Sequence, residues 1–466
     1  MADTPLRVAV VGSGPAGFYA AGHLLASEDP RVEVDLIERL PTPWGLVRLG
    51  VAPDHPNIKA VSRAFEKIAA RPGFRFLGNV EVGRDLGHGD LTRLYDAVVY
   101  TVGAQTDRRL GVPGEDLLGS WPATAFVAWY NGHPDFQDLE FDLSHERAVV
   151  VGVGNVALDV ARMLALTHEE LAATDTTDAA IEAIARSGLR EIVVLGRRGP
   201  VQAAWTPVEL GELGELEGAD VLVDPAELEL DPASAAELEA APQTVQRNVQ
   251  ILRDYGARTP AGKPRAIRLR FLVSPVAIHG EERVEAVEVV RNRLEAGPDG
   301  RVRAVPTGER ETVPCGIVFR SVGYRGVSLG GLPFEEGAGT IPNAGGRVLD
   351  GDGALRQAYC AGWIKRGPTG VIGTNKKDAT ETADALLEDA RAGLVGGTGQ
   401  PAAAVDRLLA ERGVEVVTYA GWEAIDALER ARGEPVGRPR VKLCSWEELL
   451  AAARSREAPI VSMRTE

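Results

Sequence analysis

The chain has 466 residues, of which 67 are acidic and 51 basic, and its formal net charge is −16. This excess of negative charge argues against nucleic acid as a general partner, and the length predicts two to four domains. The three cysteines, Cys315, Cys360 and Cys444, lie far apart with no C-x-x-C, which excludes a disulfide scaffold, an internal iron–sulfur cluster and a dithiol redox site.

The chain opens on a short apolar strand, residues 8–11, which runs into a G-x-G-x-x-G turn and a helical pattern. The first glycine of such a motif permits the turn, the second lets a pyrophosphate approach the backbone, and the third lets helix and strand pack closely. The turn therefore predicts a dinucleotide site made of Gly12, Ser13, Gly14, Pro15, Ala16 and Gly17.

The next predicted strand, residues 32–37, ends at Glu38, where the motif places a carboxylate for the ribose hydroxyls. Residues 40–56 follow as a loop rich in proline and glycine, whose apolar residues indicate packing against a flat ring system. A helix over 58–70 and strands over 74–82 and 95–104 complete a first α/β unit.

After an irregular crossing over 107–143, the strand, glycine turn and helix start return at residues 148–157. Ala157 stands at the third glycine position, as the motif permits. The strand over 191–195 then ends in Arg197 and Arg198 instead of an acid. Paired guanidinium groups match a 2′-phosphate in charge and geometry, so the second dinucleotide is predicted to be NADP.

The later pattern predicts antiparallel strands over 268–276 and 283–291, and a strand over 317–323 that returns the chain to the first domain. A glycine-rich loop leads into a long helix that ends near Arg391, with Thr374 or Asn375 as its cap and Asp378 in its first turn. Two further helical patterns, over 402–412 and 422–432, carry no chemical signature.

Charge is divided unevenly along the chain. Residues 209–239 contain no lysine or arginine, whereas residues 247–270 contain seven basic residues against Asp254 alone. Such runs are most often solvated faces, but in an acidic protein the basic run is also the best candidate dock for an acidic partner.

The chain shows no Ser-His-Asp set, no metal-ligand cluster and no P-loop, so its chemistry is expected to come from bound cofactors. Two dinucleotide folds are the plan of a flavoprotein reductase, in which NADPH delivers hydride to a flavin that serves a one-electron acceptor. We also find no apolar run of membrane-spanning length and no segment before the first strand, so a cytoplasmic location is expected.

Four segments closely resemble the adrenodoxin-reductase-type ferredoxin–NADP reductases, particularly the bacterial members: residues 40–56, 154–162, 196–200 and 362–377. The resemblance runs over essentially the full chain. It implies an α/β fold of two Rossmann-like domains, with the NADP domain (107–321) inserted into a discontinuous FAD domain (1–106 and 322–466).

The resemblance also implies the site residues. FAD would be held by Gly12 to Gly17, Glu38, Leu46, Val82, Trp363, Gly370, Val371 and Ile372, and NADP by Val153, Gly154, Asn155, Val156, Arg197, Arg198, Glu209 and Gly370, with Arg108 near the pyrophosphate. His55 and Glu212 would lie close to the nicotinamide as candidates for proton handling or hydride geometry. For His55, a purely structural role beside Pro56 stays open.

The expected partner is an acidic ferredoxin, docked on Arg247, Arg253, Arg258, Lys263 and Arg265. Two other functions stay open. One is an electron-input subunit like the small subunit of glutamate synthase, against which the missing N-terminal cysteine motifs count. The other is a flavin-bound sensor that uses both nucleotide sites without turnover.

Overall fold

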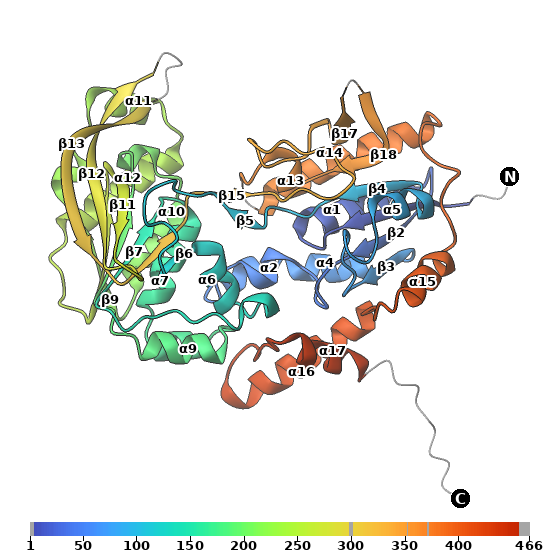
Figure 1. The fold of residues 1–466 in the computed structure, drawn as a ribbon, viewed down its shortest axis with the longest axis horizontal. Helices are drawn as coiled ribbons and strands as arrows, with labels where there is room; N and C mark the ends of the chain where they lie inside the picture. The colour runs from blue at the N-terminus through green and yellow to red at the C-terminus, as the bar shows by residue number, and fades with distance from the viewer. Residues whose placement is uncertain (1–3, 298–301, 352, 371, 456–466) are drawn as a thin grey trace, which may run out of the picture.

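The computed structural model describes residues 4–297, 302–351, 353–370 and 372–455. The chain forms two lobes, each built around a largely or wholly parallel sheet covered by helices (Figure 1). The first lobe combines the N-terminal segment with the C-terminal part of the chain, and the second is formed by the middle of the chain. We call them the flavin lobe and the nicotinamide lobe after the predictions above.

The flavin lobe contains a seven-stranded sheet. Its order is β16 (Asn343–Ala344), β17 (Arg347–Asp350), β18 (Gly353–Cys360), β4 (Ala97–Tyr100), β1 (Leu6–Val11), β2 (Val32–Ile37) and β3 (Phe74–Leu77). The strands from β18 to β3 run parallel. β1 is buried along its whole length, which agrees with its uninterrupted apolar sequence. The strand order reverses beside β1, where open α/β sheets bind ligands.

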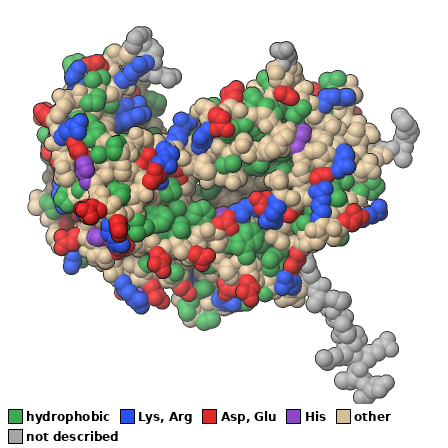
Figure 2. Space-filling model, in the orientation of Figure 1, with side chains coloured by type: hydrophobic (Ala, Val, Ile, Leu, Met, Phe, Trp, Pro, Cys, Tyr) green, Lys and Arg blue, Asp and Glu red, His purple; other side chains and the backbone are tan. Residues whose placement is uncertain are grey.

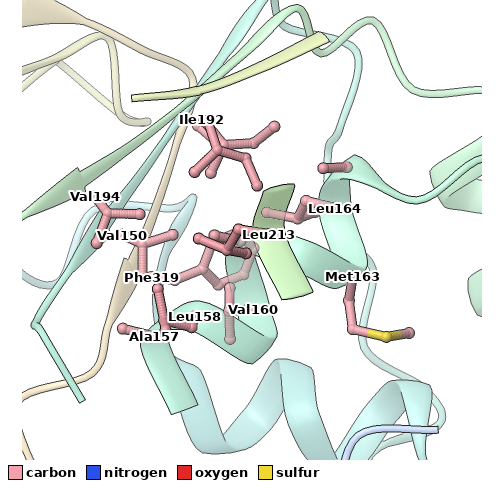
Figure 3. Close-up of a cluster of buried hydrophobic side chains, with 14 of the residues drawn as sticks. Val150, Ala157, Leu158, Val160, Met163, Leu164, Ile192, Val194, Leu213 and Phe319 are labelled. Atoms are coloured by element: carbon pink, nitrogen blue, oxygen red, sulfur yellow. The ribbon is translucent and has the colours of Figure 1, made fainter. Parts of the chain in front are cut away.

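The nicotinamide lobe contains a six-stranded, fully parallel sheet. Its order is β6 (Ser120–Pro122), β14 (Ile317–Arg320), β7 (Arg147–Val151), β8 (Glu191–Leu195), β10 (Arg265–Arg270) and β9 (Ala219–Val223). Its core packs the sheet against α7 (Asn155–Ala165). Figure 3 shows Val150, Ile192 and Phe319 of the sheet together with Leu158 and Leu164 of this helix.

Two smaller sheets complete the architecture. β11 (Val273–His279), β12 (Ala286–Ala296) and β13 (Val302–Pro314) form an antiparallel sheet on the nicotinamide lobe. β5 (Thr106–Asp107) pairs antiparallel with β15 (Tyr324–Arg325), and both lie where the chain crosses between the lobes.

The remaining helices cover the two sheets and extend the C-terminal part of the chain. They are α1 (Pro15–Leu24), α2 (Leu46–Leu49), α3 (Pro56–Lys59), α4 (Ser62–Ala69), α5 (His88–Leu94), α6 (Ala123–Tyr130), α8 (His168–Ala172), α9 (Asp178–Ala185), α10 (Pro207–Glu212), α11 (Pro232–Ala240), α12 (Gln243–Ala257), α13 (Trp363–Arg366), α14 (Ile372–Arg391), α15 (Ala402–Glu411), α16 (Tyr419–Gly433) and α17 (Trp446–Arg454).

The prediction of two Rossmann-like units is confirmed, while several element boundaries were wrong. The helix expected over 58–70 is two helices, α3 and α4, and the strand expected over 74–82 ends at Leu77. The crossing over 107–143 is not irregular throughout, because it contains β6 and α6. In α6 every residue except Thr124 is buried, so the sequence shows no polar face and no helical period.

Two predictions about the path of the chain were wrong. β14 does not return the chain to the first lobe, since it lies inside the second sheet between β6 and β7. The run over 268–276 is divided between β10, which pairs parallel with β8 and β9, and β11 of the antiparallel sheet. The division of the chain at residues 106 and 321 stays a prediction.

Candidate active site

The first glycine turn has the geometry that its motif requires. Gly12 has φ +100°, and a Cβ there would lie 2.7 Å from the carbonyl oxygen of Thr101. A Cβ on Gly17 would lie 2.0 Å from the carbonyl oxygen of Gly12, so the helix packs directly on the turn. A Cβ on Gly14 would meet nothing within 4 Å. The turn therefore has open space at the one position where a pyrophosphate would approach the backbone.

Two distant segments close around this turn. Trp44 donates its backbone N–H to the carbonyl of Ser13 (3.0 Å), and Gly45 lies so near that a Cβ would be 2.9 Å from Gly14 Cα. From the far C-terminal side, Gly362 approaches with φ +78°, and a Cβ there would lie 2.7 Å from Ala16 Cβ. The loop over 40–56 and the segment after β18 therefore border one site with the turn.

Glu38 joins strand β2 to the same turn. One carboxylate oxygen accepts from the backbone N–H (3.0 Å) and the hydroxyl (2.6 Å) of Ser13, and the other accepts from the Leu40 N–H (3.0 Å). An ionised carboxylate has about four lone-pair sites, so acceptor capacity remains for a hydroxyl of a bound ribose.

The second glycine turn repeats the first. Gly152 has φ +138°, and a Cβ there would lie 2.0 Å from the carbonyl oxygen of Ser321, whereas a Cβ on Gly154 would meet nothing within 4 Å. Asn155 starts α7, and its side-chain oxygen accepts from the Thr206 backbone N–H (3.0 Å). Val153 is tied to the same segment, because its carbonyl accepts from the Ala204 N–H (2.9 Å).

Arg197 and Arg198 stand on a backbone that the antiparallel sheet fixes. Asn292 donates its side-chain amide to the Arg197 carbonyl (2.8 Å), and Leu272 donates its N–H to the Arg198 carbonyl (3.1 Å). In the described part of the chain, neither guanidinium has a carboxylate within 4 Å. Burial and the neighbouring Arg197 charge lower the pKa of Arg198. An anion placed between the two groups would relieve this repulsion.

A hydrogen-bonded pair and an ion pair cross from one lobe to the other beside these turns. His55, from the loop over 40–56, lies 2.8 Å from Glu212 at the end of α10. Arg162 of α7, only 2% exposed, donates two hydrogen bonds to Asp54 (2.6 and 3.1 Å) and one to Asp159 (2.8 Å). The structure thus brings together the two predicted nicotinamide-side residues, although they are 157 positions apart.

Burial controls the charge of these acids. It raises the pKa of Asp159, which lies under Arg162, and the pKa of Glu209 in the first turn of α10. Burial is also the largest single effect on Asp54, but the hydrogen bonds and the positive charge of Arg162, together with smaller contributions, outweigh it and lower the pKa of that carboxyl. Beside Asp54, His55, Arg162 and Glu212 a cavity of about 230 Å³ opens to the surface. Figure 2 shows the molecule hollowed between its two lobes.

The other predicted residues differ in how far they are exposed. Leu46 is 39% exposed, and Gly370 and Arg108 are exposed at the ends of their loops. Trp363 lies against Tyr324 with ring centroids 5.2 Å apart, and its buried indole nitrogen has no hydrogen-bond partner among the described residues. Val82 and Ile372 are half-buried, while Val371 lies outside the described residues.

Comparisons with known proteins agree with this arrangement. Residues 6–187 match the family described as pyridine nucleotide-disulphide oxidoreductase. NADPH-ferredoxin reductase FprA of Mycobacterium leprae is 52% identical over 452 residues, covering 95% of this chain and 97% of that one. Human mitochondrial NADPH:adrenodoxin oxidoreductase is 44% identical, covering 95% and 91%. The structure of Mycobacterium tuberculosis FprA in complex with NADPH superposes with a TM-score of 0.92 at 50% identity, covering 97% of this chain and all of that one.

The chain belongs to the adrenodoxin-reductase-type family of ferredoxin–NADP reductases. The resemblance noted from the sequence is therefore confirmed. Among the described residues of this reductase, no helix is both long enough and apolar enough to cross a membrane. Over the same residues, His, Cys, Asp and Glu side chains form no group of three that could hold a metal ion.

Several parts of the reductase site differ from what its sequence indicated. Thr374 and Asn375 do not cap α14, which begins at Ile372, and Asn375 instead accepts from Arg366 (2.7 Å). Asp378 lies in the second turn of α14, where its carboxylate accepts from the Gly362 N–H. Asn292 and Asp54 were missed, because only the fold places them beside Arg197 and Arg162.

The structure separates the predicted docking residues into an exposed group and a group that is hydrogen-bonded within the lobe. Arg247, Arg253 and Arg258 are exposed on or just after α12. Arg265 is not available as a docking residue, because its guanidinium donates to the carbonyls of Leu164, Leu166 and Ile184 and to the Ser187 hydroxyl. The Lys263 ammonium donates to the Leu216 carbonyl. Both side chains therefore bind backbone carbonyls within the nicotinamide lobe instead of facing a partner.

Proposed function

We propose that this chain is an FAD-dependent oxidoreductase that moves electrons between NADPH and a ferredoxin-type iron–sulfur carrier. The observation that carries the proposal is the pair of glycine turns on two lobes joined by ion pairs. Each turn has open space only at its second glycine, Gly14 or Gly154. FAD, when bound, accepts a hydride and releases electrons singly.

The residues fit the two cofactors. For FAD, we propose the turn from Gly12 to Gly17, the Glu38 carboxylate and Leu46 at the start of α2, with Trp363 and its unpaired indole nitrogen on the C-terminal side. Val82, Gly370, Val371 and Ile372 remain proposed neighbours by resemblance. For NADP, we propose Val153 to Val156, Glu209, Gly370 and the two arginines Arg197 and Arg198, with Arg108 at the pyrophosphate.

An anaerobic titration tests the function. The oxidised holoprotein is titrated with NADPH and separately with NADH while the visible flavin spectrum is recorded, and oxidised ferredoxin is then added. We expect bleaching at lower NADPH than NADH, followed by recovery of colour as ferredoxin is reduced. A protein that bleaches and passes electrons only to a larger complex would favour the input-subunit function, and one that never bleaches would favour the sensor.

We propose that His55 and Glu212 handle a proton or set hydride geometry at the crossing between the lobes. Replacing Glu212 with Gln keeps a hydrogen-bonding group near His55 but removes the carboxylate, and we expect flavin reduction by NADPH in stopped flow to slow by at least about tenfold. FAD content should not change. Glu215→Gln, on the exposed edge of the same cavity, is the matched control. An unaltered rate in Glu212→Gln and in His55→Asn would give both residues a structural role.

We propose that ferredoxin docks on the exposed arginines of the basic run, Arg247, Arg253 and Arg258. Replacing all three with Gln should raise the KM for ferredoxin by about tenfold at low ionic strength and by much less at high salt, because exposed charges are screened. Ferricyanide reduction should not change. A variant that loses the same charge elsewhere, at Lys67, Arg407 and Arg430, is the control. Equal ferredoxin kinetics in both triple variants would move the dock to another surface.

The cytoplasmic location expected from the sequence stays a proposal.

A further inference from the structure

The last described part of the chain lies against both lobes. Residues 418–455, which we call the C-terminal strap, comprise α16, the short helix η5 (Glu434–Val436) and α17. Figure 1 shows α16 and α17 beneath the flavin lobe and beside α9 of the nicotinamide lobe. The strap is the segment to which the sequence assigned no role.

The strap is anchored first in the flavin lobe. Glu429 of α16 is fully buried and accepts from both terminal nitrogens of Arg48 (2.5 and 2.9 Å), which is 3% exposed. Trp422 packs edge-on against Trp44, with ring centroids 4.8 Å apart. Because Trp44 donates to Ser13 of the first glycine turn, this anchor is continuous with the predicted FAD site.

A first three-way junction then joins the strap to both lobes at Asp175. This aspartate belongs to the nicotinamide lobe. One of its oxygens accepts from Lys59 of the flavin lobe (2.6 Å), and the other lies 3.4 Å from Lys442 of the strap. The Lys442 ammonium also contacts Asn131 of the nicotinamide lobe (3.2 Å) and the Arg48 carbonyl of the flavin lobe (3.4 Å).

A second junction likewise joins one residue from each lobe and one from the strap. Asp135, also of the nicotinamide lobe, accepts from Arg39 of the flavin lobe (2.6 Å) and from the Trp446 indole N–H of the strap (2.9 Å). The Arg39 guanidinium lies over the Trp446 ring, 5.7 Å from its centroid. Arg438 of the strap donates to residues on either side of Asp175, namely the carbonyls of Thr174 and Thr176 and the carboxylate of Asp178 at the start of α9.

Burial makes the first junction sensitive to the position of the lobes. The Lys442 side chain is 1% exposed, and burial lowers its pKa to about 7, opposed by Asp175 and assisted by Lys59 and Arg48. A buried ammonium is tolerated only with its partners in place. Those partners come from both lobes, so a displacement of one lobe removes part of the set.

We propose that the C-terminal strap fixes the distance and orientation of the nicotinamide lobe relative to the flavin lobe. In this proposal Lys442 and Trp446 are positioning residues for hydride transfer between the lobes. The inference rests on the proposed function, because hydride transfer needs reacting atoms about 3–3.5 Å apart. The two glycine turns stand on different sheets, so the contacts between the lobes, these two junctions among them, set that separation.

The test compares the variant Lys442→Met/Trp446→Phe with Arg430→Met. Met keeps most of the aliphatic stem, Phe keeps a ring over Arg39, and Asp175 and Asp135 each retain their flavin-lobe partner. Arg430 is an exposed residue of α16 whose one ion pair with described residues is to Asp426 in the same helix, so its variant loses the same charge without touching a junction. The readouts are FAD content, affinity for 2′,5′-ADP, the rate of flavin reduction by NADPH, and tryptic cleavage after Arg108 and Arg109 in the crossing.

We expect flavin reduction in the double variant to slow at least tenfold and cleavage in the crossing to accelerate at least fivefold. FAD content should not change, and 2′,5′-ADP affinity should stay within twofold, because that fragment contacts one lobe. Arg430→Met should match the unmodified protein in all readouts. If the double variant loses FAD, Trp446→Phe alone is measured, with at least threefold slower reduction expected.

Reduction and cleavage rates within twofold of the unmodified protein, in the double variant or in the single one that replaces it, would overturn the proposal. A failure of the proposed function gives a different result, because the unmodified holoprotein would then not be bleached by NADPH. The cleavage rates would still report whether the strap holds the lobes.

Discussion

Replacing Arg197 and Arg198 together with Gln should weaken the preference of this reductase for NADPH over NADH. Each charge-assisted hydrogen bond is worth about 1.5–3 kcal/mol, and a tenfold change in affinity corresponds to about 1.4 kcal/mol. We therefore expect the KM for NADPH to rise at least about tenfold while the KM for NADH stays within about twofold. Steady-state kinetics with both coenzymes and ferricyanide as acceptor measure this difference.

The structure supplies a matched control for that experiment. Arg108 is exposed, donates its backbone N–H to the Gly323 carbonyl (2.9 Å), and is proposed to face the pyrophosphate that both coenzymes share. Arg108→Gln should raise both KM values by similar factors. If the Arg197/Arg198 variant instead weakens NADPH and NADH equally, the two arginines do not read a 2′-phosphate.

The parts of the fold that the sequence predicted are those with strong local signals. β1, β7 and β8 are short apolar runs, and each glycine turn needs residues without a Cβ where two backbones meet. The apolar run and the glycine spacing that follows it fall within about ten residues, so the pattern is visible in the sequence even though some of the backbone that the glycines meet is distant. Helix α6, in which Thr124 is the one residue that is not buried, was missed because it has no polar face to give a helical period.

The parts that escaped prediction depend on contacts between distant segments. Asp175, Asp135 and Lys442 read as ordinary charged residues, and only the fold places them at the junctions of the C-terminal strap. Family resemblance alone indicated that His55 and Glu212 lie close to the nicotinamide, and their direct hydrogen bond was not predicted. The charge of Arg265 suggested a docking role, but its guanidinium donates hydrogen bonds to three backbone carbonyls inside the nicotinamide lobe.

Two of the three glycines of the first turn, Gly17 and Gly14, should respond to the same substitution in opposite ways. In Gly17→Ala the added Cβ would lie 2.0 Å from the Gly12 carbonyl oxygen and 2.9 Å from Thr101 Oγ1, so α1 must move away from β1. Such overpacking against backbone should cost about 3 kcal/mol or more. We expect a lower melting temperature of the apoprotein and no retained FAD.

In Gly14→Ala the added Cβ meets no protein atom within 4 Å, and the residue has φ −73°, which any amino acid adopts. The apoprotein should therefore unfold within about 0.5 kcal/mol of the unmodified chain. The methyl group would instead occupy the space proposed for the FAD pyrophosphate, so the Kd for FAD should rise at least about tenfold, or about 1.4 kcal/mol. Gly89→Ala, at an open position of α5, controls for the added methyl group. Unchanged FAD binding in Gly14→Ala would mean that the pyrophosphate does not lie against this turn, since the substitution leaves the protein no other reason to lose the cofactor.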